Sequence, residues 1–94
     1  MVRQVAVDYA RYGIRINAVA PGPIDTPMMW KTVSDEEVQA VLETLEREVP
    51  LGRIGTSEDV ARCVVWLLSD DAGFVTGATF TVDGGVASKQ VLPL

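Results

Sequence analysis

The apolar positions at the start of the chain repeat with the period of a helix and then with that of a strand. Residues 2–12 place their apolar side chains three and four positions apart, which predicts one apolar helical face. Gly13 follows, and a glycine just beyond the last apolar position is a common helix stop. Residues 14–20, IRINAVA, predict a strand that is apolar on both faces near its end, as in a parallel sheet covered by helices.

Two further helices are predicted after a proline-rich loop at residues 21–33. Ser34 and Glu37 have the spacing of a capping box, with Ser34 as the N-cap of a helix that stops at Pro50. Residues 56–59, TSED, form a second capping signal. The helix that they open carries apolar residues at helical spacing: Val60, Val64, Leu67 and Leu68.

The last predicted strand is 78–82, ATFTV, in which apolar and polar residues alternate. The order helix, strand, two helices, strand predicts an α/β fold with a parallel pair of strands. Two strands alone leave both sheet edges exposed and seldom form a stable sheet. We therefore expect the C-terminal portion of a doubly wound, Rossmann-type parallel sheet, incomplete as a fold.

Composition and charge narrow the possible functions. The 94 residues allow one domain at most, and 48% hydrophobic residues with a mean hydropathy of +0.21 argue against disorder. We expect no signal peptide, no membrane segment and a cytoplasmic location. The net charge of −5, with Lys and Arg scattered, argues against nucleic-acid binding. A single cysteine, Cys63, and no histidine predict neither a disulfide framework nor a metal site.

The turn that follows the first predicted strand is the strongest candidate site, because ligands bind at the carboxyl ends of strands in such sheets. Pro21 and Pro23 fix φ and stiffen the turn. Gly22 lets the backbone approach a flat ligand. Ile24 can offer its backbone N–H and C=O to an amide, and Thr26 can offer a hydroxyl. The alternative is a rigid turn that only leads the chain out of the sheet.

Several short motifs occur in one order along the chain: NAVAPG, I-x-T, PLGR, FVTG and VDGG. Over residues 2–85 the chain resembles the C-terminal part of a short-chain dehydrogenase/reductase of the classical type. The resemblance implies an NAD(P)-dependent oxidoreductase that interconverts an alcohol and a carbonyl compound. It implies that Pro21 and Gly22 lie beside the nicotinamide and that the backbone of Ile24 binds the carboxamide. Thr26 is implied to hydrogen-bond the carboxamide or a cofactor phosphate.

The same resemblance implies that residues 1–94 form a partial NAD(P)-binding Rossmann domain. Met28, Met29 and Trp30 become candidates to close over an apolar substrate, and their alternative role is core packing between loop and helix. The implied segments are a remnant helix at 1–13, a strand and nicotinamide-side loop at 14–26, a substrate loop and helix at 27–50, the last helix and strand at 51–85, and a tail at 86–94.

The departures from the family pattern concern the chemistry. The glycine-rich nucleotide fingerprint and the strand-borne catalytic serine are absent from the sequence. The family's Tyr-x-x-x-Lys pair is absent too, because Gly13 stands four residues after Tyr9 and Ile16 four residues after Tyr12. We therefore expect no catalytic residue in this chain, with Ser, Tyr and Lys in upstream sequence. The chain alone is expected to be inactive and to bind the cofactor weakly or not at all.

Other interpretations of the sequence compete with these. A non-catalytic, stand-alone chain could form a homo-oligomer through residues 56–85, since the last helix and strand pack against a second subunit in the family. Asp25 and Asp83 are interpreted as turn and capping residues rather than as an acid–base pair. Asn17 is expected to satisfy backbone groups, and Cys63 to be a small buried hydrophobe. The substrate and the choice between NAD and NADP stay open.

Overall fold

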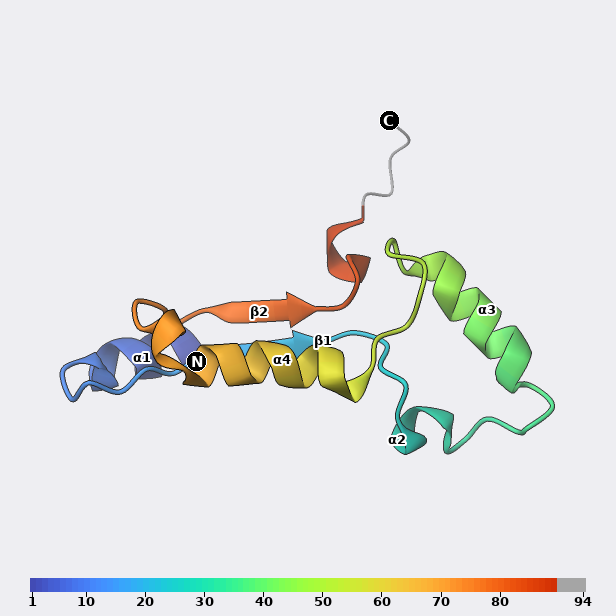
Figure 1. The fold of residues 1–94 in the computed structure, drawn as a ribbon, viewed down its shortest axis with the longest axis horizontal. Helices are drawn as coiled ribbons and strands as arrows, with labels where there is room; N and C mark the ends of the chain where they lie inside the picture. Colours follow the sequence, from blue (N-terminus) through green and yellow to red (C-terminus); the bar gives the residue numbers. More distant parts are fainter. Residues whose placement is uncertain (90–94) are drawn as a thin grey trace.

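Two short parallel strands form the centre of the structure, a computed structural model that describes residues 1–89 (Figure 1). The C-terminal part of the predicted tail lies outside the described residues. The elements are α1 (Val2–Ala10), β1 (Ala18–Pro21), α2 (Pro27–Trp30), α3 (Val38–Glu48), α4 (Ser57–Leu68) and β2 (Thr79–Val82), with 3-10 turns η1 (Asp70–Ala72) and η2 (Val86–Ser88).

The strands pair as the sequence predicted. β1 and β2 are parallel, with Ala18 opposite Thr79 and Pro21 opposite Val82. The pairing continues past β1, where the N–H of Gly22 donates to the C=O of Val82 at 2.9 Å. An α/β fold with a helical crossover between parallel strands is therefore confirmed.

The predicted strand at 14–20 begins later than expected, at Ala18. Before it, the guanidinium of Arg15 donates to the C=O groups of Leu67 at 2.8 Å and Ser69 at 3.1 Å. A cation at these carbonyls satisfies acceptors at the C-terminus of α4 and complements the helix dipole. A tertiary contact of this kind gives no periodic signal, so the strand start was placed too early.

Asn17 ties the entry of β1 to the entry of β2. Its Nδ2 donates to the C=O of Val75 at 3.1 Å, and its Oδ1 accepts from the N–H of Ala78 at 3.1 Å. The prediction that Asn17 satisfies backbone groups is confirmed.

One of the two predicted capping boxes forms. Thr56 Oγ1 accepts from the N–H of Asp59 at 3.1 Å, and Asp59 Oδ2 accepts from the N–H of Thr56 at 2.8 Å. The other prediction is wrong: Glu37, not Ser34, is the N-cap of α3, with no side-chain cap bond. Ser34 instead donates its hydroxyl to the Glu37 carboxylate at 2.9 Å, so neither side chain reaches the first turn of the helix.

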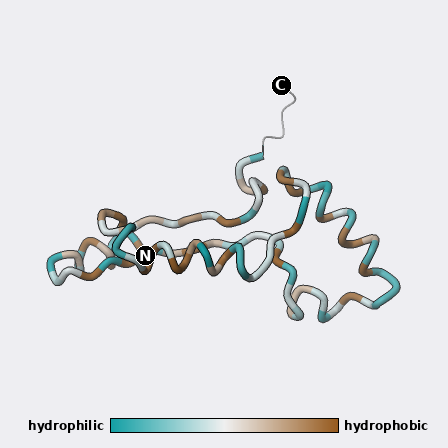
Figure 2. Tube along the Cα trace, in the orientation of Figure 1, coloured by the Kyte–Doolittle hydropathy of each residue, from teal (hydrophilic) through white to brown (hydrophobic). Residues whose placement is uncertain are grey.

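The apolar side chains are only partly covered. α4 packs on the sheet, where Trp66 and Phe80 meet edge to face with ring centroids 5.9 Å apart. Hydrophobic residues recur along α4 and the strands (Figure 2), yet the side chains of Val65 and Leu68 are 66% and 79% exposed. α3 stands away from the sheet (Figure 1). The radius of gyration is 16.7 Å, whereas a compact domain of this length has about 12 Å.

Candidate functional site

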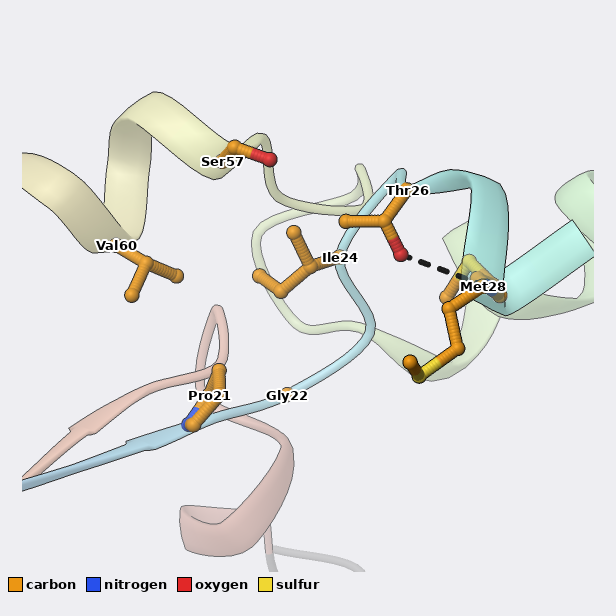
Figure 3. Close-up of a pocket in the computed structure, with 8 residues that line it drawn as sticks. Pro21, Gly22, Ile24, Thr26, Met28, Ser57 and Val60 are labelled. Atoms are coloured by element: carbon orange, nitrogen blue, oxygen red, sulfur yellow. Dashed lines mark hydrogen bonds between the residues drawn. The ribbon is translucent and has the colours of Figure 1, made fainter.

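A pocket lies where the chain leaves β1, and it brings together the four predicted cofactor contacts (Figure 3). Its volume is about 480 Å³. It also includes Met28 and Met29 of the predicted substrate loop, and Ser57 and Val60 of α4, which were not predicted as site residues. The lining residues are Pro21, Gly22, Ile24, Thr26, Met28, Met29, Ser57 and Val60.

A one-residue parallel bridge between Ile24 and Gly55 shapes the pocket wall. Gly55 donates its N–H to the C=O of Pro23 at 2.9 Å and accepts from the N–H of Asp25 at 2.8 Å. Ile24 lies between Pro23 and Asp25, and in a parallel bridge the N–H and C=O of such a residue point away from the bridge partner. Within the described residues, the N–H and C=O of Ile24 make no backbone hydrogen bond. The pocket wall thus offers one adjacent donor and acceptor.

Gly22 has a structural role besides any contact with a ligand. A Cβ at this position would lie 2.5 Å from Asp83 Cβ and 2.8 Å from Asp83 Cα, closer than real side-chain contacts. The position therefore requires glycine because the ends of β1 and β2 approach each other. The approach of a flat ligand to Gly22, which the sequence suggested, stays a prediction.

The loop predicted at 21–33 contains a helical turn, α2, that the sequence analysis missed. Thr26 is its N-cap, with Oγ1 accepting from the N–H of Met29 at 3.4 Å, and Pro27 is its first residue. A threonine N-cap followed by proline was a usable helix-start signal. Because Thr26 only accepts in this cap, its hydroxyl proton is available to a ligand in the pocket.

The structure separates the three substrate-loop candidates. Met28 is 84% exposed at the rim of the pocket, and Met29 is half-buried in its wall. Trp30 does not line the pocket; its indole Nε1 donates to Asp25 Oδ1 at 2.7 Å. That bond ties the end of α2 back to the loop that precedes it.

The charged groups near the pocket are engaged in turns and caps. Asp83 accepts from the N–H groups of Ala87 at 2.8 Å and Gly85 at 2.9 Å, and these bonds lower the pKa of its carboxyl. Arg53 pairs with Asp59 at 2.9 Å, and this bond lowers the pKa of Asp59. The turn role expected of Asp83 is confirmed, and no titratable side chain lines the pocket.

The two tyrosines lie at the other end of β1 from the pocket, on and just after α1 (Figure 1). Their rings are 5.9 Å apart, and the Arg11 guanidinium donates to the Tyr12 hydroxyl at 2.9 Å. Neither tyrosine is placed to exchange a proton with a ligand in the pocket. Among residues 1–89 there is also no cluster of metal-ligating side chains, and no helix is long and apolar enough for a membrane span.

Comparison with known proteins assigns the family. Residues 1–87 match the family profile described as enoyl-(acyl carrier protein) reductase. The chain belongs to the short-chain dehydrogenase/reductase family. The 3beta-hydroxysteroid dehydrogenase 1 of Eggerthella lenta is 44% identical over 92% of this chain and 32% of its own length. The 2-(S)-hydroxypropyl-CoM dehydrogenase 3 of Xanthobacter autotrophicus is 44% identical over 94% of this chain and 35% of its own length.

Solved structures of similar fold agree. The Thermoplasma acidophilum aldohexose dehydrogenase superposes with a TM-score of 0.89 at 32% identity, over 99% of this chain and 38% of its own. YwfH, described as an NADPH-dependent reductase, superposes with a TM-score of 0.83 at 25% identity, over 95% of this chain and 36% of its own. This short-chain dehydrogenase/reductase chain thus spans about a third of the length of the relatives that it matches. Oxidoreductase chemistry and NAD(P) use are properties of that family.

Proposed function

We propose that this chain supplies the nicotinamide side of the active site in an NAD(P)-dependent oxidoreductase that interconverts an alcohol and a carbonyl compound. In this proposal residues 1–94 are the C-terminal part of a Rossmann domain, divided as the sequence analysis expects. The observation that carries it is the pair of unused peptide groups of Ile24 at the pocket wall.

These groups fit the nicotinamide carboxamide, which has one donor and one acceptor on the same carbon. The C=O of Ile24 accepts from the amide NH₂, its N–H donates to the amide oxygen, and the Thr26 hydroxyl adds a third bond. Pro21 and Val60 give the flat ring apolar contacts. When bound, the nicotinamide supplies hydride transfer. The residues of this chain fix which face of the ring meets the substrate, and such orientation contributes much of the rate.

Proton transfer in this proposal depends on groups outside the chain. Reduction of a carbonyl needs a proton donor near the forming alcohol, and none of the lining side chains titrates. The chain alone is therefore proposed to bind one end of the cofactor and to be inactive.

The test is an NMR titration of the ¹⁵N-labelled chain with NADH, reduced nicotinamide mononucleotide and ADP-ribose. The two nicotinamide compounds should shift the amide signals of Ile24 and Thr26 with affinities no tighter than millimolar, and ADP-ribose should leave them unchanged. Thr26→Val should weaken the shifts, whereas the matched control Thr26→Ser keeps the hydroxyl and should preserve them. Unshifted Ile24 and Thr26 signals would overturn the proposal. Micromolar affinity would contradict the one-sided site.

A second candidate function is self-association without catalysis. A pocket of about 540 Å³ lies along one side of α4. We call it the outer α4 surface and define it by Ala61, Arg62, Val65 and Trp66. Its exposed apolar side chains favour the homo-oligomer contact proposed within residues 56–85. A cytoplasmic location stays a prediction.

A further inference from the structure

Ile24 is shared by the candidate pocket and a second, smaller pocket. The smaller pocket has a volume of about 190 Å³. Among the described residues, Ile24 alone lines both pockets. The candidate pocket has no charged lining, whereas Arg53 and Asp59 are among the residues that line the smaller one. The two charged side chains therefore lie next to the residue whose peptide groups carry the proposed function.

Arg53 and Asp59 are joined by a two-point ion pair. Arg53 Nη1 donates to Asp59 Oδ2 at 2.9 Å, and Nη2 donates to Oδ1 at 3.3 Å. Arg53 Nη1 also donates to the C=O of Ile54 at 3.1 Å, and Asp59 Oδ2 accepts from the N–H of Thr56 at 2.8 Å. A guanidinium and a carboxylate that meet at two points fix each other's orientation. These bonds therefore hold residues 53–59 in one shape.

Gly55 belongs to this segment and lies against Ile24. A Cβ at Gly55 would lie 2.7 Å from Ile24 Cδ1 and 3.6 Å from Asp59 Oδ2, so Gly55 is close to both side chains. Its N–H and C=O bond the residues on either side of Ile24, which are Pro23 and Asp25. A shift of Gly55 therefore turns the N–H and C=O of Ile24.

A second ion pair at the start of α4 lacks these connections. Arg62 Nη2 and Glu58 Oε2 are 3.5 Å apart, and their side chains are 77% and 80% exposed. Such exposed pairs contribute little, because solvent screens the charges. The Asp59 side chain is only 24% exposed, and it also accepts from the backbone N–H that follows Gly55. The pair that contains Asp59 is therefore the one that can direct the bridge.

We propose that Arg53 and Asp59 are positioning residues for the nicotinamide carboxamide. They hold Gly55 in place, and the bridge from Gly55 directs the N–H and C=O of Ile24 into the candidate pocket. Neither charged side chain lines that pocket, so neither contacts the ring or transfers a proton. Groups that are held in their bonding direction before a ligand arrives bind it at a lower cost in entropy. The inference rests on the proposed function.

The first measurement is amide hydrogen exchange of the ¹⁵N-labelled chain without ligand. Arg53→Gln removes the two-point pair. The N–H groups of Asp25 and Gly55 should then exchange about fivefold faster relative to the N–H of Gly22, which bonds β2. The matched control Glu58→Gln breaks the exposed pair and should leave this ratio unchanged. A loss of overall stability raises all three rates together, so the ratio separates positioning from a general structural role.

The second measurement is an NMR titration of the same variants with 1-methyl-1,4-dihydronicotinamide. This compound carries the ring and the carboxamide without a net charge, so loss of the Arg53 charge does not by itself change its attraction to the chain. Arg53→Gln should weaken the affinity measured from the Ile24 amide shift by about threefold or more. Arg53→Lys should lie between Arg53→Gln and the wild type, because an ammonium restores the charge and one bond without the planar fork. Glu58→Gln should bind as the wild type does.

The two measurements keep this inference distinct from the proposed function. Ligand shifts at Ile24 that are equally strong in the wild type and Arg53→Gln support the nicotinamide contact and overturn the positioning role. An exchange ratio that Arg53→Gln leaves unchanged, or that Glu58→Gln raises equally, overturns that role as well. Faster exchange at the bridge in Arg53→Gln, with no ligand shift in the wild type, supports the hold on Gly55 and overturns the proposed function instead.

Discussion

The fold requires glycine at position 22, where the candidate site also needs space for a ligand. The ends of β1 and β2 come together there, and the space for a side chain is taken by the backbone and Cβ of Asp83. A ligand site and a close approach of two strand ends thus favour the same residue type, and the structure supports the second reason directly.

Gly22→Ala should lower the free energy of unfolding by about 2 kcal/mol, the usual cost of forcing a methyl group into filled space. The new Cβ would lie 2.5 Å from Asp83 Cβ, so the strand ends must separate. A urea melt followed by circular dichroism measures the loss. An unchanged midpoint would mean that the strand ends part freely.

Asp83 should make stability dependent on pH in the acid range. Hydrogen bonds from the N–H groups of Ala87 and Gly85 lower its pKa below the ordinary 3.8. The unfolded chain therefore binds a proton at Asp83 more readily than the folded chain does. The stability that Asp83 contributes is complete above the ordinary pKa, and it is lost as the pH falls through the lower pKa of the folded state. The urea midpoint should be flat above about pH 5 and fall below roughly pH 4.

Asp83→Asn is the variant that isolates this contribution. It should be less stable than the wild type at neutral pH and show a shallower acid loss, because Asp59 and Glu48, whose pKa values are also lowered, still titrate. Parallel curves for variant and wild type would exclude Asp83 as a source of the pH dependence.

Among the helices, α3 and α4 begin with similar sequence signals and different structures. Thr56 bonds the first turn of α4, whereas Ser34 bonds a side chain outside α3. Thr56→Ala should therefore lower the free energy of unfolding by about 1 kcal/mol, and the matched control Ser34→Ala should change it by less than about 0.3 kcal/mol. Equal losses in urea melts would contradict the capping difference.

The sequence predicted those elements whose residues repeat locally. Periodicity located α1, α3, α4 and β2, and the motif after β1 located the pocket wall. The start of β1 was missed because Arg15 and Asn17 act through partners more than fifty residues away. Ser57 and Val60 were missed as pocket residues because only the bridge between Ile24 and Gly55 brings the start of α4 to the loop.

At the scale of the whole molecule, much of the apolar surface of the described residues is uncovered. Only four apolar residues are buried among the described residues: Ala6, Val49, Leu67 and Ala72. The exposed apolar side chains of α4 divide between a groove that Val64 and Leu68 line and the outer α4 surface, where Val65 and Trp66 lie. Because α4 lines both surfaces, a substitution on each side of this helix tests each surface separately.

The free chain is expected to be marginally stable and to gain stability by self-association through the outer α4 surface. When association stabilises the folded state, its Tm rises with protein concentration. Tenfold dilution should lower the Tm of the wild type by a few degrees, and Val65→Lys should remove this dependence by placing a charge on the contact. Leu68→Lys, on the other side of α4, is the control and should keep it. A cooperative melt with a Tm independent of protein concentration, from a chain that sediments as a monomer, would contradict this prediction. The chain would then be stable with its apolar surface exposed. Sedimentation equilibrium of the same samples relates each Tm to the population of associated chain.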